Sequence, residues 1–248
     1  EGANVLRDKP DLGVGRFPVT SSTDAKIMVD KTITYLSREN AGAWKNLMYV
    51  LGDDGDENQH MRYADDVAEL VKKSYPEMEV RKIMWDAYKI ESTASNLSYP
   101  TCTQDIKRAM NEGAAVINYV GHAAPYGMSH EFVLRVSDFA ENNGKNLALW
   151  VTAACDVMPF DGQAENIGET AVLNPNGGAL AFYGTARTVY ATQNLYMNRS
   201  LMRYLFSTDN KGRKYMIGDA IRLAKNNIIM GNLESGYREN KVQVNHRY

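Results

Sequence analysis

The 248-residue sequence lacks several features, and each absence excludes a class of protein. No apolar run approaches the roughly 20 residues that a membrane-spanning helix needs. The 30 acidic and 28 basic residues nearly balance at a net charge of -2, which argues against a protein that binds the phosphate backbone of nucleic acid. Two cysteines are too few for a disulfide framework, but they could form one bridge or provide one reactive thiol.

Linkers and nucleotide-binding motifs are absent as well. The sequence has no linker rich in proline, glycine and serine and no internal repeat, so we expect one domain over residues 1–248. No predicted strand-to-helix turn carries G-x-G-x-x-G or G-K-[ST], which argues against a nucleotide-binding domain. The chain begins at Glu1 without a start methionine or signal peptide and stops at Tyr248 without a cap, so we expect a fragment of a longer protein.

The sequence does contain an alternation of strand and helix patterns. Short apolar or alternating runs predict five strands, at residues 47–51, 79–85, 115–120, 147–152 and 179–183. Periodic or capped segments predict helices at residues 21–38, 61–73, 103–112, 194–206 and 216–229. Strands and helices that alternate with short connections form right-handed βαβ units. The fold class is therefore α/β, with a mostly parallel sheet flanked by helices in a three-layer α/β/α arrangement.

A histidine and a cysteine each follow the carboxyl end of a predicted strand. His122 comes two residues after the third strand, and Cys155 comes three residues after the fourth. Ligands of open parallel sheets bind outside this edge, and strands that are consecutive in sequence are usually neighbours. Each residue alone is more often structural, because a lone cysteine after an apolar strand is usually a buried small hydrophobe. Together, at a βαβ spacing, they favour a catalytic pair.

An imidazole beside a thiol makes a nucleophile. A free thiol is mostly protonated near neutrality, and a neighbouring imidazole can take its proton. The thiolate attacks a carbonyl, and the imidazole later protonates the leaving amine. Backbone N–H groups must stabilise the oxyanion, and those of Cys155 and Ala123 are the natural candidates. The pair predicts a cysteine peptidase that requires no cofactor.

The motifs Gly121-His122 and WVTAAC (residues 150–155) resemble the caspase-like clan of cysteine peptidases and, within it, the gingipain family. Further segments follow in that family's order: residues 10–19 (PDLGVGRFPV), 52–55 (GDDG), 160–161 (FD), 167–169 (IGE), 177–181 (GGALA) and 184–190 (GTARTVY). The resemblance covers nearly the whole chain. It implies a caspase-like fold with Cys155 as nucleophile and His122 as general base.

Within the family, residues 151–156 (VTAACD), 159–161 (PFD) and 217–226 (IGDAIRLAKN) are most similar to the PorU-like sortases of type IX secretion in Bacteroidetes. The resemblance implies a secreted or outer-membrane, cell-surface peptidase. Its substrate would be secreted cargo with a C-terminal sorting domain, and other secretion-system components would be partners. A free-standing secreted gingipain-like protease and a catalytically silent surface binding module stay open as alternatives.

Three further features concern the neighbourhood of the pair. The family usually has glycine after the histidine, whereas this chain has Ala123, which would be strained at an oxyanion position only if its φ were positive. Glu131 could orient His122 as the third member of a triad does, or could begin the next helix. By analogy we expect substrate to bind along Gly184, Thr185 and Ala186, at the end of the fifth strand.

An acidic loop, residues 52–60 (GDDGDENQH), follows the first strand. It departs from the EF-hand template, and a solvated acidic loop that caps the next helix is the favoured interpretation. The resemblance adds a structural calcium ion as the alternative, and its expected ligands are Asp53, Asp54, Asp56 and Asn58. His60 and His246 lack partners at the spacing of zinc ligands, so no zinc site is expected, and His130 is expected to be structural.

Overall fold

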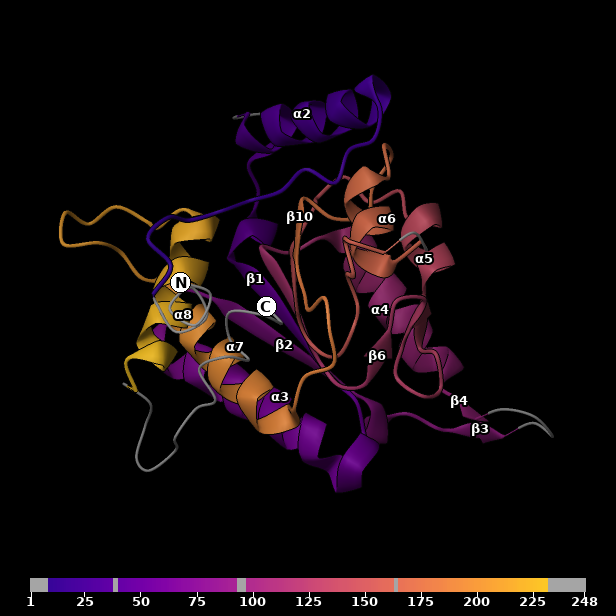
Figure 1. The fold of residues 1–248 in the computed structure, drawn as a ribbon. Helices are drawn as coiled ribbons and strands as arrows, with labels where there is room; N and C mark the ends of the chain where they lie inside the picture. The colour runs from indigo at the N-terminus through magenta and orange to yellow at the C-terminus, as the bar shows by residue number, and fades with distance from the viewer. Residues whose placement is uncertain (1–8, 38–39, 93–96, 163–164, 232–248) are drawn as a thin grey trace.

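A five-stranded, entirely parallel sheet forms the centre of the protein (Figure 1). The computed structural model describes residues 9–37, 40–92, 97–162 and 165–231. The strands lie in the order β10-β9-β5-β1-β2. Their bounds are β1 (Leu47–Gly52), β2 (Glu79–Met84), β5 (Val116–Val120), β9 (Leu149–Ala153) and β10 (Ala181–Tyr183). All five strands predicted from the sequence are present, and the α/β fold class is confirmed.

The inner strands are mostly apolar because helices cover both faces of the sheet. In β1, Met48 and Val50 face one helical layer, whereas Tyr49 and Leu51 face the other. Every residue of β1, β5 and β9 is buried. The sheet therefore has a hydrophobic core on each side, as a doubly covered parallel sheet requires.

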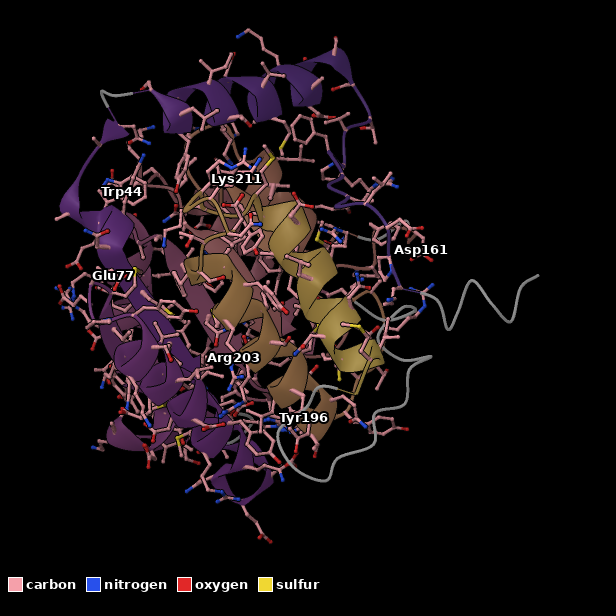
Figure 2. The ribbon with its side chains drawn as sticks, turned by 90° about the vertical axis from the view of Figure 1, so that its left-hand side faces the viewer. Trp44, Glu77, Asp161, Tyr196, Arg203 and Lys211 are labelled. Carbon is pink, nitrogen blue, oxygen red and sulfur yellow. The ribbon has the colours of Figure 1, made fainter. Side chains whose placement is uncertain are left out.

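One face is covered by α3 (Gly55–Ser74), α7 (Ala191–Phe206) and α8 (Ile217–Ile229). Figure 2 looks at this face and shows the three helices side by side across the sheet. The other face is covered by α4 (Pro100–Glu112), α5 (Val136–Glu141) and α6 (Ile167–Leu173). The helix α2 (Ser22–Leu36) lies above α6 in Figure 1 and contacts it.

Short elements complete the described part of the chain. They are the 3₁₀ turns η2 (Ala43–Asn46) and η3 (Trp85–Ala87), the pair β3 (Glu91–Ser92) and β4 (Leu97–Ser98), and the ribbon of β6 (Ala123–Ala124), β7 (Gly127–Met128) and β8 (Leu134–Arg135). The sequence prediction missed these elements because each is only two to four residues long. The prediction also began α3 too late, since the helix starts at Gly55.

In the part of the chain that the structure describes, no helix is long and apolar enough to cross a membrane.

Candidate active site

His122 and Cys155 lie at neighbouring strand ends. β5 and β9 pair in parallel, and their last paired residues are Val120 and Ala153. His122 and Cys155 each follow two residues later, and the N–H of Gly121 still donates to the carbonyl of Ala153 at 3.4 Å. The sheet therefore brings His122 and Cys155 to adjacent strand ends on its carboxyl edge.

Three hydrogen bonds fix the main chain of His122. Its N–H donates to Oδ2 of the buried Asp53 at 2.8 Å. Its carbonyl accepts from the hydroxyl of Tyr119 at 2.6 Å and from the N–H of Ser129 at 2.8 Å. Asp53 follows β1, and Tyr119 lies on β5, so two strands of the rigid sheet hold the histidine backbone in place.

The ring of His122 lies between two other histidines. His130 stacks on it, with ring centroids 4.4 Å apart, and His60 meets it edge-on at 4.7 Å. Nε2 of His122 lies 3.4 Å from Nε2 of His60 and 3.4 Å from Oδ2 of Asp56. The same carboxylate oxygen lies 3.3 Å from Nε2 of His60. Three of the chain's four histidines thus gather at this edge, together with one carboxylate.

His60 is nearly inaccessible to solvent, with 4% of its surface exposed. This burial lowers the pKa of His60 below its usual range, and the neighbouring His122 lowers it further. Its Nδ1 has no polar partner, so its polar contacts are made through Nε2. His60 is therefore a neutral ring at pH 7 whose one connected nitrogen faces His122 and Asp56.

The thiol of Cys155 is half-buried against the segment that follows β10. Its Sγ lies 3.3 Å from the carbonyl of Val189 and 3.4 Å from the N–H of the same residue. The next residue, Asp156, has a φ of 48°, and its carboxylate accepts from the hydroxyl of Thr188 at 3.0 Å. Cys102, in contrast, is fully buried, and burial raises the pKa of its thiol to about 12.

Ala123 and Glu131 differ in how they relate to His122. Ala123 lies next to the histidine in β6 and is not among the residues with positive φ, so its methyl group adds no backbone strain. Glu131 gathers with Asp53 and Asp54, with ligand oxygens of the three within 4.8 Å of one another. The sequence suggested Glu131 as the carboxylate that orients His122. In the structure the carboxylate beside the His122 ring is that of Asp56.

The expected substrate segment borders a large groove. Gly184 and Ala186 line a cavity of about 1200 Å³, as do Arg187 and Asp161, which form an ion pair at its edge. Asp161 is labelled in Figure 2. Thr185 is buried instead and donates its hydroxyl to the carbonyl of Ala154, next to the cysteine. Two of the three predicted residues therefore face the groove, and the third connects that segment to the loop of Cys155.

The four expected calcium ligands do not converge on one point. Asp53 already accepts two backbone N–H bonds, Asp54 accepts from the hydroxyl of Tyr99, and Asp56 turns toward the imidazoles. Asn58 belongs to a left-handed turn over residues 56–58. The oxygen atoms that do gather are those of Asp53, Asp54 and Glu131, and Oε2 of Glu131 is buried without a polar partner. An all-oxygen set with one unpaired carboxylate oxygen fits a calcium ion.

Comparison with known proteins identifies the family. The model of peptidase family C25 matches residues 2–247. The chain belongs to peptidase family C25. This is the gingipain family of cysteine peptidases, so the family expected from the sequence is confirmed. No curated protein matches the chain.

Solved structures share the fold of this C25 chain. The Arg-specific cysteine proteinase gingipain R is 15% identical with a TM-score of 0.71, over 94% of this chain and 52% of that one. The complex of Porphyromonas gingivalis RgpB pro- and mature domains is 16% identical with a TM-score of 0.69, and the match covers 96% of this chain and 54% of that one. A structure described as a protease is 15% identical with a TM-score of 0.64, and the match covers 92% of this chain and 52% of that one. The chain thus spans about half the length of the solved chains it matches.

Sequence reasoning did not place two other histidines beside His122. His60, for which the sequence spacing offered no zinc partner, lies 3.4 Å from His122 although 62 residues separate them. His130, expected to be structural, stacks on the same ring. One signal was available: His60 ends the loop after the first strand, and in a parallel sheet that loop lies beside the loop of His122. His246 lies outside the described residues.

Proposed function

We propose that the chain is a cysteine endopeptidase in which His122 acts as general base toward Cys155. The observation that carries the proposal is the pairing of β5 with β9, which puts the two residues at adjacent strand ends. Membership of family C25 agrees with this chemistry. The backbone bonds of His122 to Asp53 and Tyr119 also support it, because a general base must be held in position before it can work.

The base is Nδ1 of His122, because Nε2 faces Asp56. A carboxylate on Nε2 holds the proton there and leaves the lone pair of Nδ1 free to accept the thiol proton. The same carboxylate stabilises the imidazolium that forms. In this assignment Asp56 is a positioning residue, and His130 limits rotation of the ring by stacking on it.

The thiolate of Cys155 then attacks the carbonyl carbon of a peptide bond. The N–H groups of Cys155 and Ala123 are the proposed donors to the oxyanion. The tetrahedral intermediate collapses, and the imidazolium gives its proton to the departing amine. A water molecule, deprotonated by His122, hydrolyses the thioester and regenerates the thiol. Each step needs only groups that this chain supplies or that the substrate and water bring.

The substrate is a protein, bound in extended form along the groove beside Gly184 and Ala186. We further propose that the protein is a type IX secretion sortase that removes the C-terminal sorting domain of cargo at the cell surface. The motifs at residues 151–156 and 217–226 support this. Transfer of the acyl group to an amine, measured by mass spectrometry of the products, separates a sortase from a free-standing protease that only hydrolyses.

A silent binding module is the second candidate, and the sequence feature that favoured it was Ala123. Its backbone is unstrained, which removes that support. A structural calcium ion belongs to the proposal as well, at Asp53, Asp54 and Glu131 rather than in the full acidic loop.

The first experiment measures how fast each cysteine is alkylated as a function of pH, by mass spectrometry of the intact chain. Cys102 is the internal reference, because with a pKa of about 12 only about one thiol in 10⁴ is ionised at pH 8, and the residue is buried. We expect Cys155 to react below pH 7 and much faster than Cys102. His122→Ala should abolish this advantage.

The control variant is Glu57→Gln, which changes an exposed residue of the neighbouring acidic segment that has no part in the mechanism. It should retain most of the reactivity of Cys155. If Cys155 titrates as an ordinary thiol in the parent chain, the proposed base is wrong and the binding module is favoured.

A further inference from the structure

We infer that Asp56, His60 and His122 form a binding site for a zinc ion that regulates the peptidase. The three ligand atoms are Oδ2 of Asp56, Nε2 of His60 and Nε2 of His122. They form a nearly equilateral triangle with edges of 3.3, 3.4 and 3.4 Å. Two residues come from the first turns of α3, and the third comes from the loop after β5.

The size of the triangle selects the coordination geometry. Zinc binds nitrogen and oxygen at about 2.0–2.2 Å, mostly as a tetrahedron, whose edges are about 1.6 times that distance, or about 3.3–3.5 Å. An octahedral ion at about 2.1 Å needs shorter edges, about 3.0 Å. The observed edges therefore match the spacing of ligand atoms on one face of a zinc tetrahedron and are longer than those of the small octahedral ion.

The chemistry of the ligands points to the same ion. Two imidazoles and one carboxylate favour zinc and other first-row transition metals over calcium or magnesium, which prefer oxygen alone. His60 is almost completely buried, and its Nε2 is the nitrogen that lies near both other ligand atoms. The three carboxylates of Asp53, Asp54 and Glu131 lie in the adjoining loops and add negative potential that attracts a cation.

Regulation follows from the nitrogen that the metal takes, and this step rests on the proposed function. A metal on Nε2 of His122 leaves the proton on Nδ1, which then cannot accept the proton of the Cys155 thiol. It also takes the carboxylate of Asp56 away from the imidazolium. Zinc would therefore inhibit the peptidase reversibly without binding the nucleophile.

Binding is tested without activity, by titrating the chain with Zn²⁺ against a chromophoric chelator and with Co²⁺ as an optical probe. We expect one ion per chain and the intense visible bands of tetrahedral Co²⁺. Asp56→Asn should weaken binding by at least about 10-fold to 100-fold, since even loss of a partner behind a ligand has that effect. Asp56 is exposed, so this variant should fold, and His60→Gln is a second variant for the buried ligand.

The matched control is Glu57→Gln, which removes the same charge from the same turn at an exposed residue. It should bind zinc like the parent. Equal loss of affinity in Glu57→Gln and Asp56→Asn would overturn the site, because binding would then follow charge alone. Loss of binding in Cys155→Ser, with a sulfur-to-cobalt charge-transfer band in the parent, would overturn it too, since the ligands would be the catalytic pair.

The regulatory step has its own readout. Zinc should slow the alkylation of Cys155 in the parent, at concentrations that have little effect on Asp56→Asn. If zinc binds with the expected ligands but alkylation is unchanged, the regulatory step is wrong. If Cys155 shows no His122-dependent reactivity at all, the proposed function fails, whereas the binding titrations still decide whether the zinc site exists.

Discussion

Replacing Lys31 with methionine tests what joins α2 to the rest of the fold. Lys31 is buried, and its ammonium group donates to four backbone carbonyls at the end of α6 and in the following turn. The distances are 3.3 Å to Ala171, 2.8 Å to Val172, 3.1 Å to Asn174 and 2.9 Å to Gly177. The last carbonyls of a helix lack partners within it, and a cation also interacts favourably with that end of the helix dipole.

The magnitude follows from the groups that stay behind. Methionine keeps the apolar stem of Lys31, so it leaves little cavity, but it donates nothing. The carbonyl of Ala171 still accepts from the N–H of Ala179 at 2.8 Å, whereas the other three lose the ammonium. A buried carbonyl left without a donor costs about 1–3 kcal/mol, and the desolvation that lowers the pKa of Lys31 to about 8 offsets part of the total cost. We expect Lys31→Met to lower the free energy of unfolding by about 2–3 kcal/mol, which for a chain of this size shifts Tm by roughly 5–10 °C.

The assay is urea unfolding followed by tryptophan fluorescence, and the same helix provides the control. Lys26 is exposed and pairs only with the exposed Asp30, so Lys26→Met should change stability by about 0.5 kcal/mol or less. The reasoning is refuted if the two substitutions differ by less than about 1 kcal/mol. That result would mean that water or relaxed loops satisfy the three carbonyls as well as the lysine does.

Three other substitutions test the sheet and its carboxyl edge. Gly121→Ala places a Cβ 2.3 Å from the hydroxyl of Tyr119, and this clash must displace the loop that holds His122. Peptidase activity should therefore fall by about 100-fold while the circular dichroism is unchanged. Full activity would contradict the reasoning. Asn118 and Asn198 exchange two buried hydrogen bonds at 3.0 Å, so each change to leucine should cost about 1–3 kcal/mol, and the double variant should cost less than the sum in a double-mutant cycle. Calcium at about 100 times its dissociation constant should stabilise the chain by about 2.7 kcal/mol in thermal unfolding. Glu131→Gln should remove most of that gain, and an equal gain in the variant would place the ion elsewhere.

The sheet could be predicted because its sequence signals are local. Runs such as residues 47–51 and 115–120 are mostly apolar at successive positions, and in runs of five or six residues this pattern favours a strand that is covered on both faces. The start of α3 could not be predicted in the same way. Its first residues, Asp56 to Asn58, adopt positive φ values of 54–63°. Asp and Asn tolerate this conformation as single residues, but nothing local predicts three such residues in a row.

The candidate site was predictable only in part. The positions of His122 and Cys155 follow from a rule about strand ends, which needs nothing beyond the strand assignments. The contacts of Asp56 and His60 with His122 depend on where the first turns of α3 lie relative to the loop after β5. Tertiary packing sets that position, so it could not be predicted from the local sequence. Glu131 shows the same limit, because its spacing to His122 suggested a contact that the ribbon of β6, β7 and β8 directs to Asp53 and Asp54 instead.

Backbone strain in the described residues is concentrated where the chemistry is proposed. Six residues other than glycine have positive φ: Asp56, Glu57, Asn58, Ser129, Phe132 and Asp156. Three of them lie at the start of α3, two lie between β7 and β8, and Asp156 follows β9. Such conformations cost of order 1–3 kcal/mol each. Residues keep such strained conformations only when packing and hydrogen bonds around them leave no other conformation accessible. The stability that holds this strain comes from the two buried cores and from the Lys31 contacts at the opposite, amino edge of the sheet. Weakening these interactions should therefore loosen the carboxyl edge before the sheet itself unfolds.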